Sequence, residues 1–164
     1  MLQQTTVSKG AKRFGWLDGV FHDTSEKKEI ACDIAFLCDD YAAAVRIAAN
    51  LSSHSRWIPY PFLSTRLKKI AEEMRAQAEA LRIKIAELDG QLPQVSMENR
   101  DLMEFRQNVK RLVGDMEEHA SRTEIMMHQR NQIKDPDVIR LIDALVLDMQ
   151  RQKEELLDIV MRLS

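Results

Sequence analysis

RLKKIAEEMRAQAEALRIKIAELDGQLP, the segment Arg66–Pro93, carries apolar residues at intervals of three, four and seven along the chain. These residues are Leu67, Ile70, Met74, Leu81, Ile85 and Leu88. Such spacing places them on one face of an α-helix and is typical of a helix that packs into a bundle. Gln77 interrupts this apolar face in mid-helix, three residues after Met74.

The same pattern recurs near the end of the chain, in the segment 146–163, VLDMQRQKEELLDIVMRL. Together with the preceding Leu145, its apolar face comprises Met149, Leu156, Ile159 and Leu163. Gln152 interrupts this face three residues after Met149. Two predicted helices therefore carry a Met-x-x-Gln sequence near the middle of the expected bundle.

Capping residues and prolines mark the ends of the predicted helices. Asp23 begins the first helix as an N-cap with Glu three residues later, and Pro59 lies beyond its end. Gly90 ends the second helix, and Asp135-Pro136 begins the last. The predicted helices span about residues 24–54, 62–89, 100–133 and 136–163. On the first helix, the residues expected to face inward are Ile30, Ile34, Leu37, Tyr41, Ala44, Ala48 and Leu51. On the third helix, they are Leu102, Phe105, Val109, Leu112, Met116, His119, Thr123 and Met126.

These helices predict an all-α, antiparallel four-helix bundle over residues 23–164. The first and second helices, and the third and fourth, have short connections and are therefore expected to be antiparallel neighbours. The connection between the second and third is longer, which allows a crossover along the bundle. The corner after the first helix contains Trp57 and Tyr60, which we expect to cover the end of the core.

Residues 1–22 are predicted to form an arm outside the bundle. Basic residues precede aromatic ones between Lys9 and Phe21, and Gly10, Gly15 and Gly19 disfavour a helix there. We expect the arm to dock on its own bundle or on a neighbouring subunit. The alternative is contact with a partner or an anionic membrane surface through Lys9–Phe21.

Composition restricts the class of protein. The chain has 164 residues, of which 45% are hydrophobic and 30% charged, as expected for one folded domain. The net charge of −2 argues against a nucleic-acid-binding protein. No apolar run is long enough for a transmembrane helix, and Met1–Gly10 is too polar for a signal peptide. Cys32 and Cys38 lack metal-site spacing, so we expect reduced thiols in a cytoplasmic protein.

Two long segments carry a family resemblance. YPFLSTRLKKIAEEMRAQAEALRIKIAELDGQLP (60–93) and DPDVIRLIDALVLDMQRQKEELLDIV (135–160) are similar to the second and fourth helices of the ferritin-like superfamily, in its bacterioferritin and rubrerythrin branch. DDYAAAVRIAANL (39–51) resembles the first helix, and VKRLVGDMEEHASRTEIMMH (109–128) resembles the third. The resemblance implies a homodimer packed through the first two helices. It also implies a di-iron site built from Glu on the first and third helices and Glu-x-x-His on the second and fourth.

The implied iron ligands are absent by residue type. In the register that the resemblance favours, the former ligand positions are occupied by Ala44, Met74, Gln77, Met149 and Gln152, with either Met116 or His119 on the third helix. Thioethers and amides are poor ligands for iron. We therefore expect no di-iron centre, hydrogen bonding between the two glutamines, and a binding or structural protein rather than an enzyme.

Three alternatives involve a metal. In the first, the protein is an iron-binding ferroxidase or peroxide scavenger with altered ligands. In the second, it binds Cu(I) or haem through Met74, Met116, Met149 and His119. In the third, the inward faces of the second and fourth helices are shifted by one residue, so that Glu73 and Asp148 point into the bundle. That shift rotates each helix by about 100° and exposes apolar residues such as Leu67, Leu81 and Leu156, at a cost of several kcal/mol.

The remaining polar residues are expected at the surface. His22, His54 and His128 are interpreted as surface or helix-end residues, and Asp39-Asp40, Glu72-Glu73 and Glu117-Glu118 as a solvated face. The sequence contains no glycine-rich phosphate loop and no nucleophile motif, which disfavours nucleotide-binding and hydrolase functions.

Overall fold

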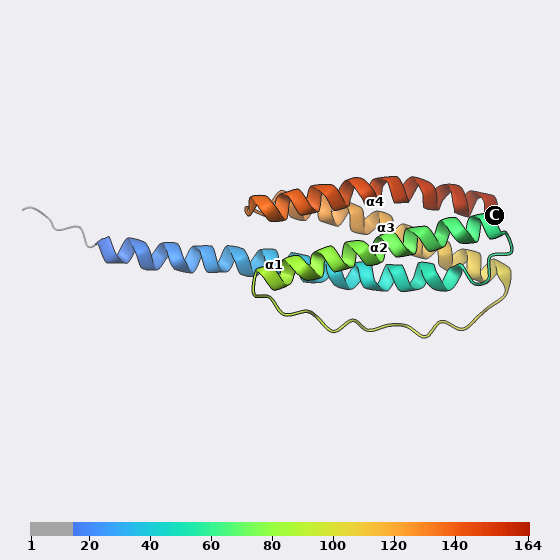
Figure 1. Cartoon of the computed structure of the whole chain (residues 1–164), viewed down its shortest axis with the longest axis horizontal. Coiled ribbons are helices and arrows are strands. Elements are labelled where there is room, and N and C mark those ends of the chain that lie inside the picture. Colours follow the sequence, from blue (N-terminus) through green and yellow to red (C-terminus); the bar gives the residue numbers. More distant parts are fainter. Residues whose placement is uncertain (1–14) are drawn as a thin grey trace, which may run out of the picture.

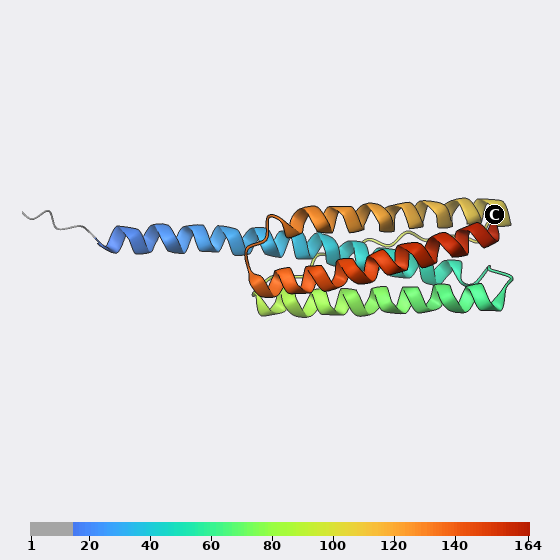
Figure 2. The same cartoon turned by 90° about the horizontal axis from the view of Figure 1, so that it is seen from above.

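The computed structural model describes the backbone of residues 15–164 and the side chains of residues 24–164. The elements are α1 (Gly15–His54), α2 (Pro61–Glu87), α3 (Phe105–Arg130) and α4 (Pro136–Leu163), with no strand among the described residues (Figure 1). α1 and α2 are antiparallel neighbours, as are α3 and α4; α3 also packs beside α1, and α4 beside α2 (Figures 1 and 2). The predicted all-α four-helix bundle is confirmed.

The apolar faces of α2 and α4 form the core, as their spacing predicts. All five residues predicted on the α4 face are buried, and so are Leu67, Ile70, Met74, Leu81 and Ile85 on α2. Asp148 is exposed and Glu73 is only half-buried, so the alternative register shifted by one residue is wrong. Burying Leu67, Leu81 and Leu156 stabilises the observed register, because each is almost fully removed from water.

α1 begins earlier than the sequence predicts. Its first described residue is Gly15 rather than a residue near Asp23, and its N-terminal part projects beyond the other three helices (Figures 1 and 2). A glycine costs a helix only about 1 kcal/mol, and extending an existing helix needs no new nucleus, so Gly15 and Gly19 do not end it. The predicted arm is therefore helical from residue 15, whereas its residues 1–14, with Lys9, lie outside the described part of the chain.

A crossover of residues 88–104 runs the length of the bundle from α2 to α3 (Figure 1). Because the crossover continues to residue 104, α3 begins at Phe105 rather than near residue 100, and the predicted core residues Leu102 and Phe105 are exposed. Side chains of the folded bundle hold this segment outside the helix: Arg100 pairs with buried Asp115, and Asn108 Nδ2 donates to the Met103 carbonyl at 2.7 Å.

The turn after α2 uses its glycine for a close approach. The left-handed backbone conformation belongs to Asp89, with φ of 59°. A Cβ atom on Gly90 would lie 2.8 Å from a methyl group of Ile34, so only glycine fits there.

The corner after α1 only partly meets expectation: Trp57 packs against the core, whereas Tyr60 is exposed. No helix in the described part of the chain has the length and apolar composition needed to cross a membrane.

Candidate functional site at mid-bundle

The positions predicted to face the middle of the bundle point into it. Ala44, Met74, Gln77, Met149 and Gln152 are all buried. On α3 the two predicted alternatives differ: His119 is fully buried, whereas Met116 is half-buried at the margin of the core. α3 thus contributes an imidazole to the interior.

Between these side chains lies a cavity of about 10 Å³. Its lining comprises Asp40, Ala44, Met74, Gln77, Leu81, Arg122, Met126, Leu145 and Met149. A space of this size holds one water molecule at most. Three methionine side chains fill the space around it, as flexible thioethers do in irregular parts of a core.

Two residues of the cavity wall form an ion pair that the sequence does not predict. Asp40 was interpreted as part of a solvated face, but it is 2% exposed. Arg122 Nε donates to Asp40 Oδ1 at 3.0 Å, and the amide nitrogen of Gln129, in the orientation that satisfies both of its polar atoms, donates to Asp40 Oδ2 at 3.0 Å. Burial raises the pKa of Asp40 to about 6, although the Arg122 guanidinium and the Gln129 amide act to lower it.

A series of hydrogen bonds through Gln152 connects the core to the surface. His119 Nε2 lies 3.1 Å from Gln152 Oε1, and Gln152 Nε2 donates to Glu73 Oε2 at 3.1 Å. The amide oxygen only accepts, so His119 carries its proton on Nε2. Burial lowers the pKa of His119, which keeps the imidazole neutral. Arg151 also donates to Glu73, at 2.8 Å, and so closes the chain at the surface.

The predicted hydrogen bond between the two glutamines is not formed. Gln152 uses both ends of its amide on His119 and Glu73. Gln77 Nε2 and His119 Nδ1 are buried and have no hydrogen-bond partner among the described residues. The bond is not formed because His119 on α3 and Glu73, four residues before Gln77 on α2, occupy both ends of the Gln152 amide.

Buried polar residues continue along the contact between α1 and α3. We call this contact the polar seam; it comprises Asp40, Asn50 and His54 on α1 and Asn108, Asp115, the partly exposed Arg122 and Gln129 on α3. On α3 the spacing could have revealed it, because 108, 115, 122 and 129 are seven apart, whereas on α1 the same repeat from Asp40 to His54 passes through the apolar Ile47. A seven-residue repeat keeps one line of each helix facing its neighbour.

The donor set does not fit a di-iron centre. Two bridged iron ions need several carboxylates, but among the described residues Asp40 is the only carboxylate lining the cavity, and Arg122 already binds it. The guanidinium adds a positive charge where the cations would lie. Within residues 24–164, no group of three or more His, Cys, Asp or Glu side chains is placed to hold a metal ion.

Two of the four residues considered for Cu(I) or haem line the mid-bundle cavity. Met74 and Met149 line the cavity, but Met116 and His119 do not.

Cys32 and Cys38 are free thiols, and Cys38 Sγ donates to the Gln91 carbonyl at 3.4 Å, which ties the crossover to α1.

Comparisons with known proteins agree with this architecture. No protein-family model matches the sequence, and a search of the curated proteins finds no match. Among solved structures, the chain is similar to the bacterioferritin of Desulfovibrio desulfuricans, with a TM-score of 0.59 and 17% identity over 83% of this chain and 82% of the other. That protein is described with a diiron site in different catalytic states.

A second solved structure gives the same result. A protein from Xanthomonas campestris pv. campestris is similar with a TM-score of 0.57 and 13% identity, over 83% of this chain and 92% of the other. At these identities the likeness concerns the fold alone. The helix order, the long crossover and both structural matches together show that this chain has the ferritin-like four-helix fold.

Proposed function

We propose that this protein is a ferritin-like bundle that works without a di-iron centre, as a binding or structural protein rather than as an oxidase. The observation that carries the proposal is the Asp40–Arg122 ion pair beside Met74 and Met149. The guanidinium balances the carboxylate that lines the cavity, so no cation is needed for neutrality.

The side chains around this ion pair also support a packed centre. The interior positions that the ferritin-like resemblance assigns to Glu and His hold thioethers and amides, and the space left between them accommodates at most one water molecule. His119 is neutral and uses Nε2 on Gln152. Its Nδ1 is free to accept a hydrogen bond, but one nitrogen without nearby carboxylates is a weak site for a hard cation.

Metal analysis tests the proposal directly. The protein is purified from cells grown with added iron and copper, and its metal content is measured by mass spectrometry. We expect far less than one iron or copper per chain and no oxygen consumption on addition of Fe(II). About two irons per chain with oxygen consumption would show a working di-iron protein instead, and about one copper per chain would support the thioether site.

A restored variant provides the positive control for this measurement. Met74→Glu, Gln77→His, Met149→Glu and Gln152→His place carboxylate and imidazole side chains at buried positions of α2 and α4. Combined with Arg122→Gln, which removes the competing positive charge, these changes should raise iron content above that of the wild type. Far-ultraviolet circular dichroism then confirms that the variant is folded.

The binding or structural role includes self-association through α1 and α2. Ile30 on α1 and Ile83 on α2 are exposed apolar residues on the two helices that the resemblance assigns to a homodimer. Light scattering after size-exclusion chromatography should give twice the mass of the chain. Ile83→Glu should shift the mass toward that of the monomer, whereas Leu147→Glu on α4, which is also exposed, should not. Equal effects of both changes would refute this interface.

A further inference from the structure

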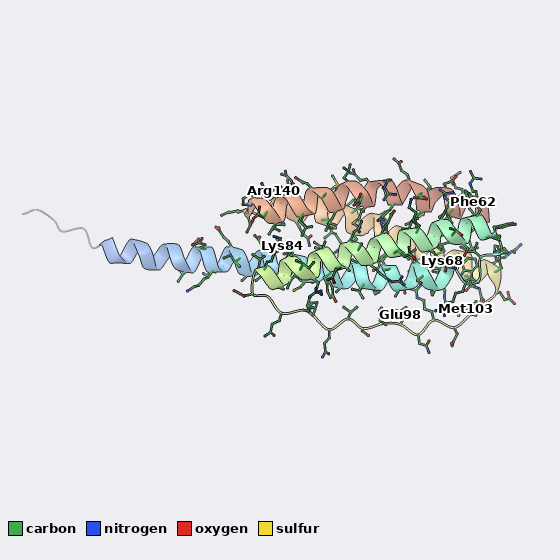
Figure 3. All side chains as sticks on the ribbon, viewed as in Figure 1. Phe62, Lys68, Lys84, Glu98, Met103 and Arg140 are labelled. Atoms are coloured by element: carbon green, nitrogen blue, oxygen red, sulfur yellow. The ribbon has the colours of Figure 1, made fainter. Side chains whose placement is uncertain are left out.

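A second cavity, of about 280 Å³, lies at the end of the bundle where α1 ends and α3 begins. Its lining comprises Ser53, His54, Arg56, Trp57, Arg100, Asp101, Leu102, Asn108 and Arg111. The crossover forms one wall; Figure 3 shows its residues Glu98 and Met103 approaching this end of the bundle. The cavity shares no lining residue with the mid-bundle cavity, and it lies between the end of α1, the end of the crossover and the start of α3.

The rear wall of this cavity is held rigid by hydrogen bonds of the polar seam. Trp57 Nε1 donates to His54 Nδ1 at 3.0 Å, so the other imidazole nitrogen carries the proton that it shares with Asp115 Oδ2 at 2.6 Å. Arg100 Nη1 donates to the same carboxylate oxygen at 2.7 Å. Burial acts to raise the pKa of Asp115, but the hydrogen bonds from His54 and Arg100 outweigh it and lower the pKa.

At the front of the cavity, Arg56 and Arg111 form no ion pair with a carboxylate of residues 24–164. Arg111 donates to the backbone carbonyl of Asp101 at 2.9 Å and pairs with no acidic side chain of the described chain. The side chain of Arg56 is exposed and forms no hydrogen bond or ion pair with any described residue. Among the described residues, Asp101 supplies the only carboxylate in the lining, against three guanidinium groups, of which that of Arg100 already pairs with Asp115.

We propose that this cavity binds a small organic anion, with its oxyanion group on Arg56 and Arg111 and its apolar part against Trp57 and Leu102. Guanidinium groups present paired N–H donors that match the oxygens of a phosphate or a carboxylate. The half-buried indole is fixed by edge contacts, with its ring centroid 5.6 Å from those of His54 and Phe105, and offers a flat apolar wall. A volume near the lower limit for ligand cavities suits a compound the size of a phosphorylated or carboxylated single ring.

Calorimetric titration of the full chain with three probes tests the proposal. The probes are phenyl phosphate, benzoate and inorganic phosphate, each at low and high salt. We expect saturable binding of phenyl phosphate that weakens with added salt, and weaker binding of inorganic phosphate because it lacks the apolar part. Tighter binding of benzoate than of phenyl phosphate would identify the oxyanion as a carboxylate and would support the same site.

Variants connect binding to the cavity. Arg56→Gln and Arg111→Gln should each weaken binding about tenfold, because each removes charge-assisted hydrogen bonds to the anion. Lys110→Gln is the matched control, since it removes one positive charge from the exposed residue beside Arg111 and should leave the affinity unchanged. The absence of saturable binding for all three probes, or equal weakening by Lys110→Gln, would overturn the proposal. Because the cavity is distant from Asp40 and Arg122, neither result depends on the metal content of the mid-bundle centre.

Discussion

Replacing Asp40 by Asn provides the most direct test of the buried ion pair. The pKa of Asp40 is about 6 in the folded chain, against an ordinary value of 3.8. The folded state therefore binds the proton more tightly than the unfolded state does. Protonation of Asp40 then contributes stability at low pH, and this contribution is lost as the pH rises from about 4 to above 6.

The magnitude follows from the two pKa values. A difference of about 2 in pKa corresponds to about 3 kcal/mol when both titrations are complete, and to about 2 kcal/mol between pH 7 and pH 4. Asp40→Asn removes the titrating group and preserves the shape of the side chain. Between pH 7 and pH 4, the free energy of unfolding of the wild type should rise by about 2 kcal/mol relative to that of the variant.

Urea denaturation followed by circular dichroism at pH 4, 5, 6 and 7 measures this difference. Other acidic groups titrate in both proteins, so their contributions cancel in the comparison. Asp148→Asn, which removes an exposed carboxylate from α4, is the control and should follow the wild type at every pH. Parallel profiles for wild type and Asp40→Asn would refute the reasoning, because they would show that Asp40 has the same proton affinity in both states.

Three further predictions concern other parts of the bundle. Because burial lowers the pKa of His119 below 6.5, its contribution to stability is lost as the pH falls below that value. Between pH 7 and pH 5, denaturation should therefore show the free energy of unfolding of His119→Gln rising relative to that of the wild type. Gly114→Ala should add about 1 kcal/mol to the free energy of unfolding and so raise the melting temperature, since nothing lies within 4 Å of the new methyl group. Gly90→Ala should lower the melting temperature, because the new methyl group would lie 2.8 Å from the side chain of Ile34. Asp115→Asn removes the charge that holds Arg100, so limited proteolysis should cut the crossover faster than in the wild type; an unchanged rate would show that the ion pair does not anchor it.

The pairing of charges within the polar seam explains why the fold tolerates buried aspartates. Isolated charges in a helical core are costly, but Asp40 faces Arg122 and Gln129 on α3. Asp115 likewise faces His54 on α1 and Arg100 on the crossover. Removing one partner leaves the other buried and unpaired, which is generally more destabilising than replacing both. The double change Asp40→Leu with Arg122→Leu should therefore cost less than Asp40→Leu alone.

The bundle was predictable because its signal is local. A buried helix face repeats every three or four residues, so the residues of α2 and α4 alone predict which side chains point inward, including Met74 and Met149. Pro136 and the Asp135 cap likewise mark the start of α4, and Asp135 Oδ1 accepts from the Asp137 amide at 2.8 Å. These features involve neighbours along one helix and need no knowledge of the rest of the fold.

The pairing of polar side chains was decided only when the helices came together. Asp40 and Arg122 lie 82 residues apart, and His54 and Asp115 lie 61 apart, so no local pattern joins either pair. Whether an aspartate on a helix is solvated or buried depends on which neighbouring helix lies against it and what that helix offers. The residue pattern along the chain thus predicts four helices and the inward faces of α2 and α4. Only the assembled bundle shows that α1 meets α3 through charged residues, because hydrogen bonds act over about 3 Å between segments that folding brings together.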